Sequence, residues 1–98
     1  MIRFTQYPPR CESPHVPDSA EYEPLTWMSP REGEPEARVL RWTCDCQPVV
    51  YELVTLGGVR YIRRIQTLKE RRLIHETDRW IDRVAEGLWN ALLFGHVR

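Results

Sequence analysis

The chain has 98 residues, of which 42% are hydrophobic, and its 14 basic and 14 acidic side chains give a formal net charge of zero. This length provides one small domain with a modest core, and the apolar content argues against general disorder. The neutral charge removes the bulk electrostatic attraction that nucleic acids or anionic membranes require. No window reaches the roughly 18 apolar residues of a membrane span, and the N-terminus lacks the apolar run of a signal peptide. We therefore expect a cytoplasmic protein, a location that also suits three cysteines without a disulfide pattern.

Residues 1–36 are predicted to form a proline-rich, acidic arm. All but one of the eight prolines lie in this segment, where they fix φ, remove hydrogen-bond donors and disfavour helix in the preceding residue. The arm also carries aromatic residues, notably Trp27 within residues 24–28, and aromatic residues are uncommon in solvated tails. We expect an irregular arm that is partly docked on the rest of the chain. An exposed peptide for a partner is the alternative.

Three strands are predicted next. Apolar and polar side chains alternate in residues 38–46, which is typical of a half-buried strand. Two β-rich runs follow, at Val49–Leu56 and residues 59–65, and the Gly-Gly pair between them suits a two-residue hairpin loop because both glycines accept positive φ. The register that this loop imposes places Glu52 opposite Arg63 and apolar residues opposite apolar residues, so we expect an antiparallel hairpin.

The last predicted element is a long helix. Polar residues 67–72 indicate a turn, and a helix is expected near residues 77–94, with Thr77 as its N-cap and Gly95 at its end. The expected fold is therefore α+β: the proline-rich arm, then a three-stranded antiparallel sheet and one C-terminal helix packed on it, which form a β-β-β-α domain over residues 37–98. The apolar face of the helix is formed by Ile81, Val84, Ala85, Leu88 and Leu92.

Two cysteines, Cys44 and Cys46, form the most distinctive motif. In a regular strand they would share one face about 7 Å apart, too far for a disulfide between them. Core packing as small apolar side chains is one interpretation. The alternative is a structural zinc site, completed by Cys11 and by His15 or His75, if the strand turns at the motif. Redox use is disfavoured, because an acidic residue between the two cysteines opposes thiolate formation. No other cofactor is expected.

The apolar arc of the predicted helix is wider than one sheet contact requires. Four large aromatic residues, Trp27, Trp80, Trp89 and Phe94, are therefore candidates for a partner surface. The chain carries none of the catalytic motifs that hydrolases, metalloproteases or nucleotide-binding enzymes use. We therefore predict a non-enzymatic protein–protein interaction module, regulatory or homodimeric.

A nucleic-acid-binding regulatory protein is the alternative function. Arg60, Arg63 and Arg64 surround Tyr61 on the predicted hairpin, and arginines with aromatic residues on a sheet are typical of single-strand binders. The hairpin register, however, places Arg63 on the face opposite to Arg60 and Arg64, which would divide the group.

Overall fold

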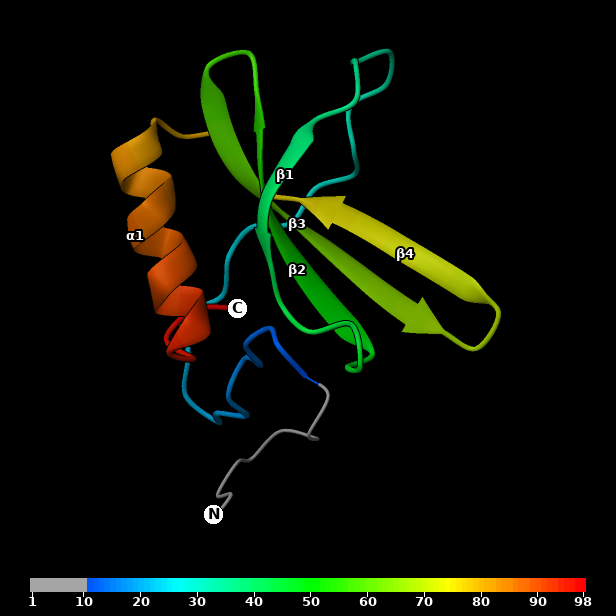
Figure 1. The fold of residues 1–98 in the computed structure, drawn as a ribbon, viewed down its shortest axis with the longest axis vertical. Helices are drawn as coiled ribbons and strands as arrows, with labels where there is room; N and C mark the ends of the chain where they lie inside the picture. Colours follow the sequence, from blue (N-terminus) through cyan, green and yellow to red (C-terminus); the bar gives the residue numbers. More distant parts are fainter. Residues whose placement is uncertain (1–10) are drawn as a thin grey trace.

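Four antiparallel strands follow one another across a single sheet in their order along the chain. The computed structural model describes residues 11–98, so the first ten residues of the predicted arm lie outside the described residues. The architecture is α+β, as the sequence predicted (Figure 1). The strands and the helix are β1 (Arg38–Trp42), β2 (Val49–Leu56), β3 (Val59–Leu68), β4 (Arg71–Glu76) and α1 (Asp82–Leu93).

The hairpin of β2 and β3 has the predicted register. Leu56 lies opposite Val59 and Glu52 lies opposite Arg63. The connecting residues Gly57 and Gly58 have φ of 63° and 83°, the left-handed values that a tight two-residue hairpin loop requires. The prediction of this hairpin is confirmed.

The sheet has a fourth strand where a turn and the start of a helix were expected. Strand β3 continues to Leu68, a two-residue loop at Lys69 reverses the chain, and β4 pairs back along β3. Lys69 takes the left-handed φ of 46°, so no glycine marks this turn in the sequence. The strand itself is mostly polar because it lies at the edge of the sheet, where both faces are partly open.

The helix begins later than predicted, and Thr77 is not its N-cap. The Oγ1 atom of Thr77 accepts the backbone N–H of Ile62 at 3.0 Å, so the residue is buried as an extension of the β3–β4 pairing. Backbone hydrogen bonds between Arg60 and Trp80 continue this pairing before the helix starts. The end of the helix is as expected, since Gly95 has φ of 79° immediately beyond it.

Strand β1 is shorter than predicted and contains an irregularity. Its register against β2 shifts between Val39 and Arg41, and such bulges change which side chains face each side of a sheet. As a result Arg41 lies beside the helix, where it bonds Glu86 at 2.6 Å, whereas Trp42 lies opposite Glu52 on the other face. The strand ends at Trp42, so the two neighbouring cysteines lie in the β1–β2 loop and not in a strand.

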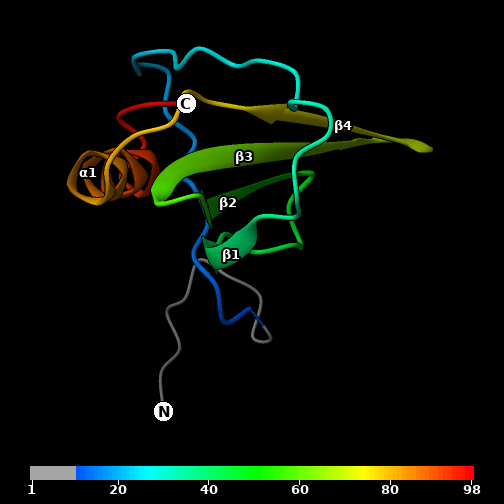
Figure 2. The same ribbon diagram turned by 90° about the horizontal axis from the view of Figure 1, so that it is seen from above.

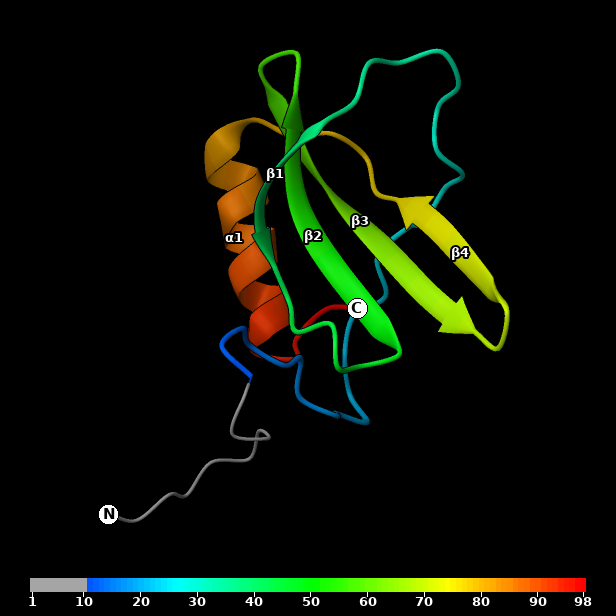
Figure 3. The same ribbon diagram turned by 45° about the vertical axis from the view of Figure 1, so that its right-hand side comes forward.

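The main core lies between the sheet and α1. Figure 2 shows the helix along one side of the sheet, while the β3–β4 hairpin extends away from it (Figure 3). A smaller apolar cluster of Ala37, Val54 and Tyr61 covers part of the opposite face. The main core is formed by Tyr51, Leu53, Ile62, Ala85, Trp89 and Leu92.

Within residues 11–98, no helix combines the length and apolar character needed to cross a membrane.

The described part of the arm lies against the domain. Met28 forms two backbone hydrogen bonds with Glu76, of 2.8 and 2.7 Å, which add one antiparallel bridge at the end of β4. Glu23 forms a parallel bridge with Val97, beyond the helix. The ring of Trp27 packs 6.0 Å from that of Tyr51. These contacts cover apolar surface that the sheet and one helix would leave open.

Candidate metal centre

The β1–β2 loop is fixed at its base before it reaches the two cysteines. Thr43 is 2% exposed, and its backbone N–H donates to Tyr51 O at 2.9 Å. Its Oγ1 atom accepts the N–H of Tyr51, also at 2.9 Å. The next residue, Cys44, donates its backbone N–H to Pro14 O at 2.9 Å. The loop and the arm are therefore held side by side by their backbones, independently of any thiol.

Four potential metal ligands meet at this junction: Cys11, His15, Cys44 and Cys46. Cys44 Sγ lies 3.2 Å from Cys11 Sγ, and Cys11 Sγ lies 3.5 Å from Cys46 Sγ. The Nε2 atom of His15 lies 3.3 Å from Cys46 Sγ. The four ligand atoms all lie within 4.8 Å of one another.

These distances are close to those of a tetrahedral zinc site. Zinc bonds of about 2.3 Å to sulfur and about 2.0 Å to nitrogen place two sulfurs about 3.8 Å apart, and sulfur and nitrogen about 3.5 Å apart. The observed sulfur–sulfur separations of 3.2 and 3.5 Å require an outward shift of only a few tenths of an ångström. A disulfide requires sulfurs at about 2.0 Å, and all three cysteines are free thiols.

The thiols influence one another's protonation. Hydrogen bonding with Cys44, followed by desolvation and a contact with Cys46, raises the pKa of Cys11 to about 12. The side-chain amide of Gln47 donates to Cys46 Sγ at 3.4 Å, and this bond is the largest of several that lower the pKa of Cys46 below its usual value. Three thiolates this close repel one another, and a divalent cation removes that repulsion and deprotonates its ligands.

Gln47 also contacts the histidine of the group, a role that the sequence did not indicate. Its side-chain nitrogen lies 3.4 Å from His15 Nδ1, while Nε2 of the same ring lies 3.3 Å from Cys46 Sγ. An imidazole that binds a metal through Nε2 normally hydrogen-bonds an outer partner through Nδ1, and the Gln47 side chain contacts that atom. No known sequence pattern indicates that a glutamine directly after a C-x-C motif contacts a ligating histidine.

The structure selects one of the two histidines that the sequence offered. His15 lies in the group, whereas His75 lies on β4 opposite Arg64. The centre is also partly open to solvent, since Cys46 is exposed, Cys44 is 6% exposed and Cys11 is intermediate. All three cysteines line a cleft of about 690 Å³.

The four aromatic residues predicted to form a partner surface differ in how deeply they are buried. Trp89 is 1% exposed and fills the main core, because its position on α1 faces the sheet directly; its assignment to a partner surface is corrected. Trp27 and Trp80 are half-buried and pack against the same core. Phe94, immediately after the helix, is 72% exposed.

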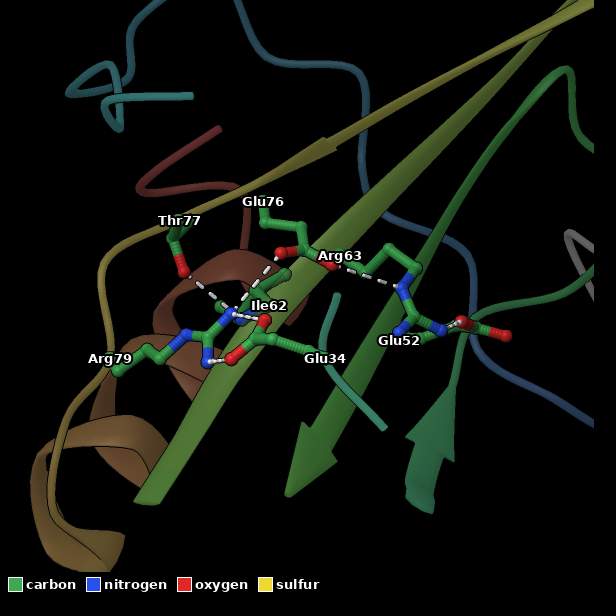
Figure 4. Close-up of polar contacts among 7 residues, drawn as sticks. All are labelled: Glu34, Glu52, Ile62, Arg63, Glu76, Thr77 and Arg79. Atoms are coloured by element: carbon green, nitrogen blue, oxygen red, sulfur yellow. Dashed lines mark hydrogen bonds and ion pairs between the residues drawn. The ribbon is translucent and has the colours of Figure 1, made fainter. Parts of the chain in front are cut away.

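The three arginines of the nucleic-acid alternative are each engaged within the domain. Arg60 contacts the carboxylates of Asp82 at 3.3 Å and Glu86 at 2.8 Å, and the guanidinium of Arg64 stacks 4.4 Å above the ring of Trp27. Arg63 lies between Glu52 and Glu76, with contacts of 3.1 and 3.6 Å. Figure 4 shows that this last group continues into a chain of alternating charges on the face opposite the helix. The arrangement gives no support to a nucleic-acid surface here.

Comparison with models of protein families, with curated proteins and with solved structures finds no match.

Proposed function

We propose that this chain is a small zinc-binding domain in which one structural zinc ion joins the N-terminal arm to the β1–β2 loop. Cys11 and His15 would bind the ion from the arm, and Cys44 and Cys46 from the loop. The observation that carries the proposal is the convergence of four ligand atoms within 4.8 Å from two segments that lie 33 positions apart. Packing of the cysteines as small apolar side chains would not explain why His15, the one histidine in the sequence of the arm, lies beside them.

The ligand set favours zinc over other metals. Thiolate and imidazole are the donors that zinc prefers, whereas magnesium and calcium prefer oxygen. Four protein ligands also close the tetrahedron, as in structural sites, and leave no position for a catalytic water. The proposed role is therefore non-enzymatic. A reducing compartment such as the cytoplasm suits a site that depends on free thiols.

Such an ion would supplement the contacts that the arm makes itself. The arm has no helix or strand within residues 11–36; it is held by isolated bridges at Glu23 and Met28, by packing of Trp27 on the core and by the ion pair of Glu34 with Arg79. A domain of this size has little surplus stability from its core alone, and a structural zinc ion contributes folding free energy directly. The ion would fix the start of the described arm where its backbone meets Cys44.

Zinc content tests the proposal. Protein purified without chelator or nickel resin is expected to contain one zinc per chain by elemental analysis, and His15→Ala is expected to lose it. His96→Ala is the matched control, because it removes an exposed histidine beyond the helix and is expected to keep the metal. A wild-type chain that is folded but takes up no zinc would contradict the proposal.

A second candidate function is protein binding through the outer side of α1. Three large apolar side chains are exposed along this helix and at its ends: Ile81 at 56%, Val84 at 42% and Phe94 at 72%. Apolar side chains at an exposed surface are buried when another chain covers them, and we propose a second copy of the chain as the occupant. Sedimentation is expected to show a dimer that Val84→Ser with Phe94→Ser converts to a monomer; a wild-type monomer at high concentration would exclude it.

A further inference from the structure

We infer that the proposed zinc centre is also a site of modification by hydroperoxides, which convert Cys11 and Cys46 to a disulfide and release the zinc. The inference rests on the proposed zinc site and assigns it a regulated state. It follows from two geometric features: one thiol of the centre is open to solvent, and a second thiol lies beside it.

Cys46 is the thiol that an oxidant reaches first. It is the exposed cysteine of the group, whereas Cys44 is 6% exposed and Cys11 is intermediate. The cleft of about 690 Å³ that the cysteines line is large enough for a small peroxide to approach their sulfurs. Oxidation of cysteine follows thiolate character and exposure, and both conditions meet at a zinc-bound, exposed Cys46.

Cys11 is placed to complete the reaction. Its Sγ lies 3.5 Å from Cys46 Sγ, so a small movement brings the two atoms into bonding contact. It belongs to the irregular arm, which can shift without breaking a strand, whereas Cys44 directly follows Thr43, which is buried and bonded to Tyr51 at the base of the loop. The geometry therefore assigns the resolving role to Cys11.

The two steps balance with hydrogen peroxide as the only oxidant. The Cys46 thiolate attacks one peroxide oxygen; a sulfur–oxygen bond forms, the oxygen–oxygen bond breaks, and hydroxide leaves a sulfenic acid behind. The Cys11 thiolate then attacks that sulfur; the disulfide forms, the sulfur–oxygen bond breaks, and a second hydroxide leaves. Two thiolates lose two electrons in total, and peroxide gains them.

Zinc release follows from the ligand count. The disulfide removes two of the four ligands and leaves Cys44 and His15, which cannot complete a tetrahedron. The arm nevertheless stays connected to the loop, because the new bond joins the same two segments as the ion did. Oxidation therefore exchanges one cross-link for another, frees Cys44 and His15, and is reversed by a dithiol reductant followed by zinc.

The test treats the zinc-loaded protein with hydrogen peroxide and follows zinc with a chromogenic chelator. Release of one zinc per disulfide is expected, with a peptide cross-link between residues 11 and 46 by mass spectrometry and one remaining thiol that alkylates, that of Cys44. Retention of zinc under excess peroxide, or a cross-link that joins other cysteines, would overturn the inference.

Two variants separate this inference from the zinc proposal itself. Cys46→His keeps four zinc ligands but removes the reacting sulfur, so it is expected to bind zinc and resist peroxide. Cys11→His is expected to bind zinc and to accumulate a sulfenic acid at Cys46, detectable with dimedone. Equal release from Cys46→His and wild type would refute the assigned site while leaving zinc binding intact. A wild-type chain that binds no zinc would instead remove the proposed function and this inference together.

Discussion

The Sγ atom of Cys11 lies 3.2 Å from the Sγ atom of Cys44, although 33 positions separate the two residues. The contact joins an irregular arm to the loop between two strands, and a backbone hydrogen bond from Cys44 to Pro14 accompanies it. Unbonded thiols gain little from such proximity, whereas thiolates that share a zinc ion gain a large stabilisation.

Removal of zinc is expected to loosen the arm more than the sheet. The described arm is held to the domain by single backbone bridges, side-chain contacts and the proposed ion, whereas β2 and β3 are paired along their full length and contribute the buried Leu53 and Ile62. Hydrogen exchange after chelation should therefore show lost protection of the amides of Cys44 and Met28, with β2 and β3 still protected. Uniform loss across the sheet would mean that the ion supports the whole fold.

Gln47→Ala is expected to weaken zinc binding by about 10–100-fold, because outer partners of a ligating histidine orient its ring. The basis is the contact of 3.4 Å between the Gln47 side chain and His15 Nδ1. Competition with a chromogenic chelator measures the change. Gln66→Ala is the control, since Gln66 lies on β3 outside the centre, and an equal loss there would contradict the assigned role.

Trp89→Ala is expected to destabilise the fold by about 3–5 kcal/mol, the usual cost of deleting a buried aromatic side chain. Trp89 is 1% exposed, whereas Phe94, five positions later, is 72% exposed. Phe94→Ala should therefore change stability by less than about 0.5 kcal/mol. Chemical denaturation of the two variants measures both values, and similar losses would contradict the burial described for Trp89.

Acidification is expected to weaken the contact between Glu34 and Arg79. Arg79 donates to both carboxylate oxygens, at 2.6 and 2.7 Å, and lowers the pKa of Glu34 below its ordinary value of 4.5. Because the folded pKa is the lower one, the stabilisation is complete above pH 4.5 and is lost as pH falls through the folded value. Figure 4 shows the pair at one end of the charged chain.

Denaturation at neutral pH and below pH 4.5 compares the wild type with Glu34→Gln. The variant should be less stable at neutral pH, and the difference should shrink in acid. Glu36→Gln changes an exposed neighbouring carboxylate and should show no such pattern. A difference between wild type and Glu34→Gln that is independent of pH would rule out the ionic contact.

Local signals in the sequence were enough for the β2–β3 hairpin and the end of α1. The Gly-Gly loop and the pairing of Glu52 with Arg63 are short-range features, and Gly95 supplies the left-handed residue after the helix. Strand β4 was missed because its side chains are largely polar and its turn uses Lys69 in place of glycine. A polar edge strand such as β4 is recognised by its hydrogen bonds to the neighbouring strand, and the pattern of side chains along the sequence does not show those bonds.

The four candidate ligands could be named from the sequence, but their convergence could not. Strand alternation through Cys46 would have kept Cys44 and Cys46 on one face of a sheet; the strand instead ends at Trp42. The choice between His15 and His75 depended on where the arm lies. Its place is set by backbone hydrogen bonds to residues far along the chain, such as the bond from Cys44 to Pro14. The wide apolar arc of the helix did not show which part of it faces the sheet: Trp89 is buried there, whereas Val84 and Ile81 of the predicted apolar face are exposed.

X-ray absorption at the zinc edge tests the central claim most directly. The account predicts a first shell of three sulfurs at about 2.3 Å and one nitrogen at about 2.0 Å, with the nitrogen signal absent in His15→Cys and a shell of four sulfurs in its place. A first shell dominated by oxygen, or a zinc environment that is unchanged by His15→Cys, would contradict the Cys11, His15, Cys44 and Cys46 centre.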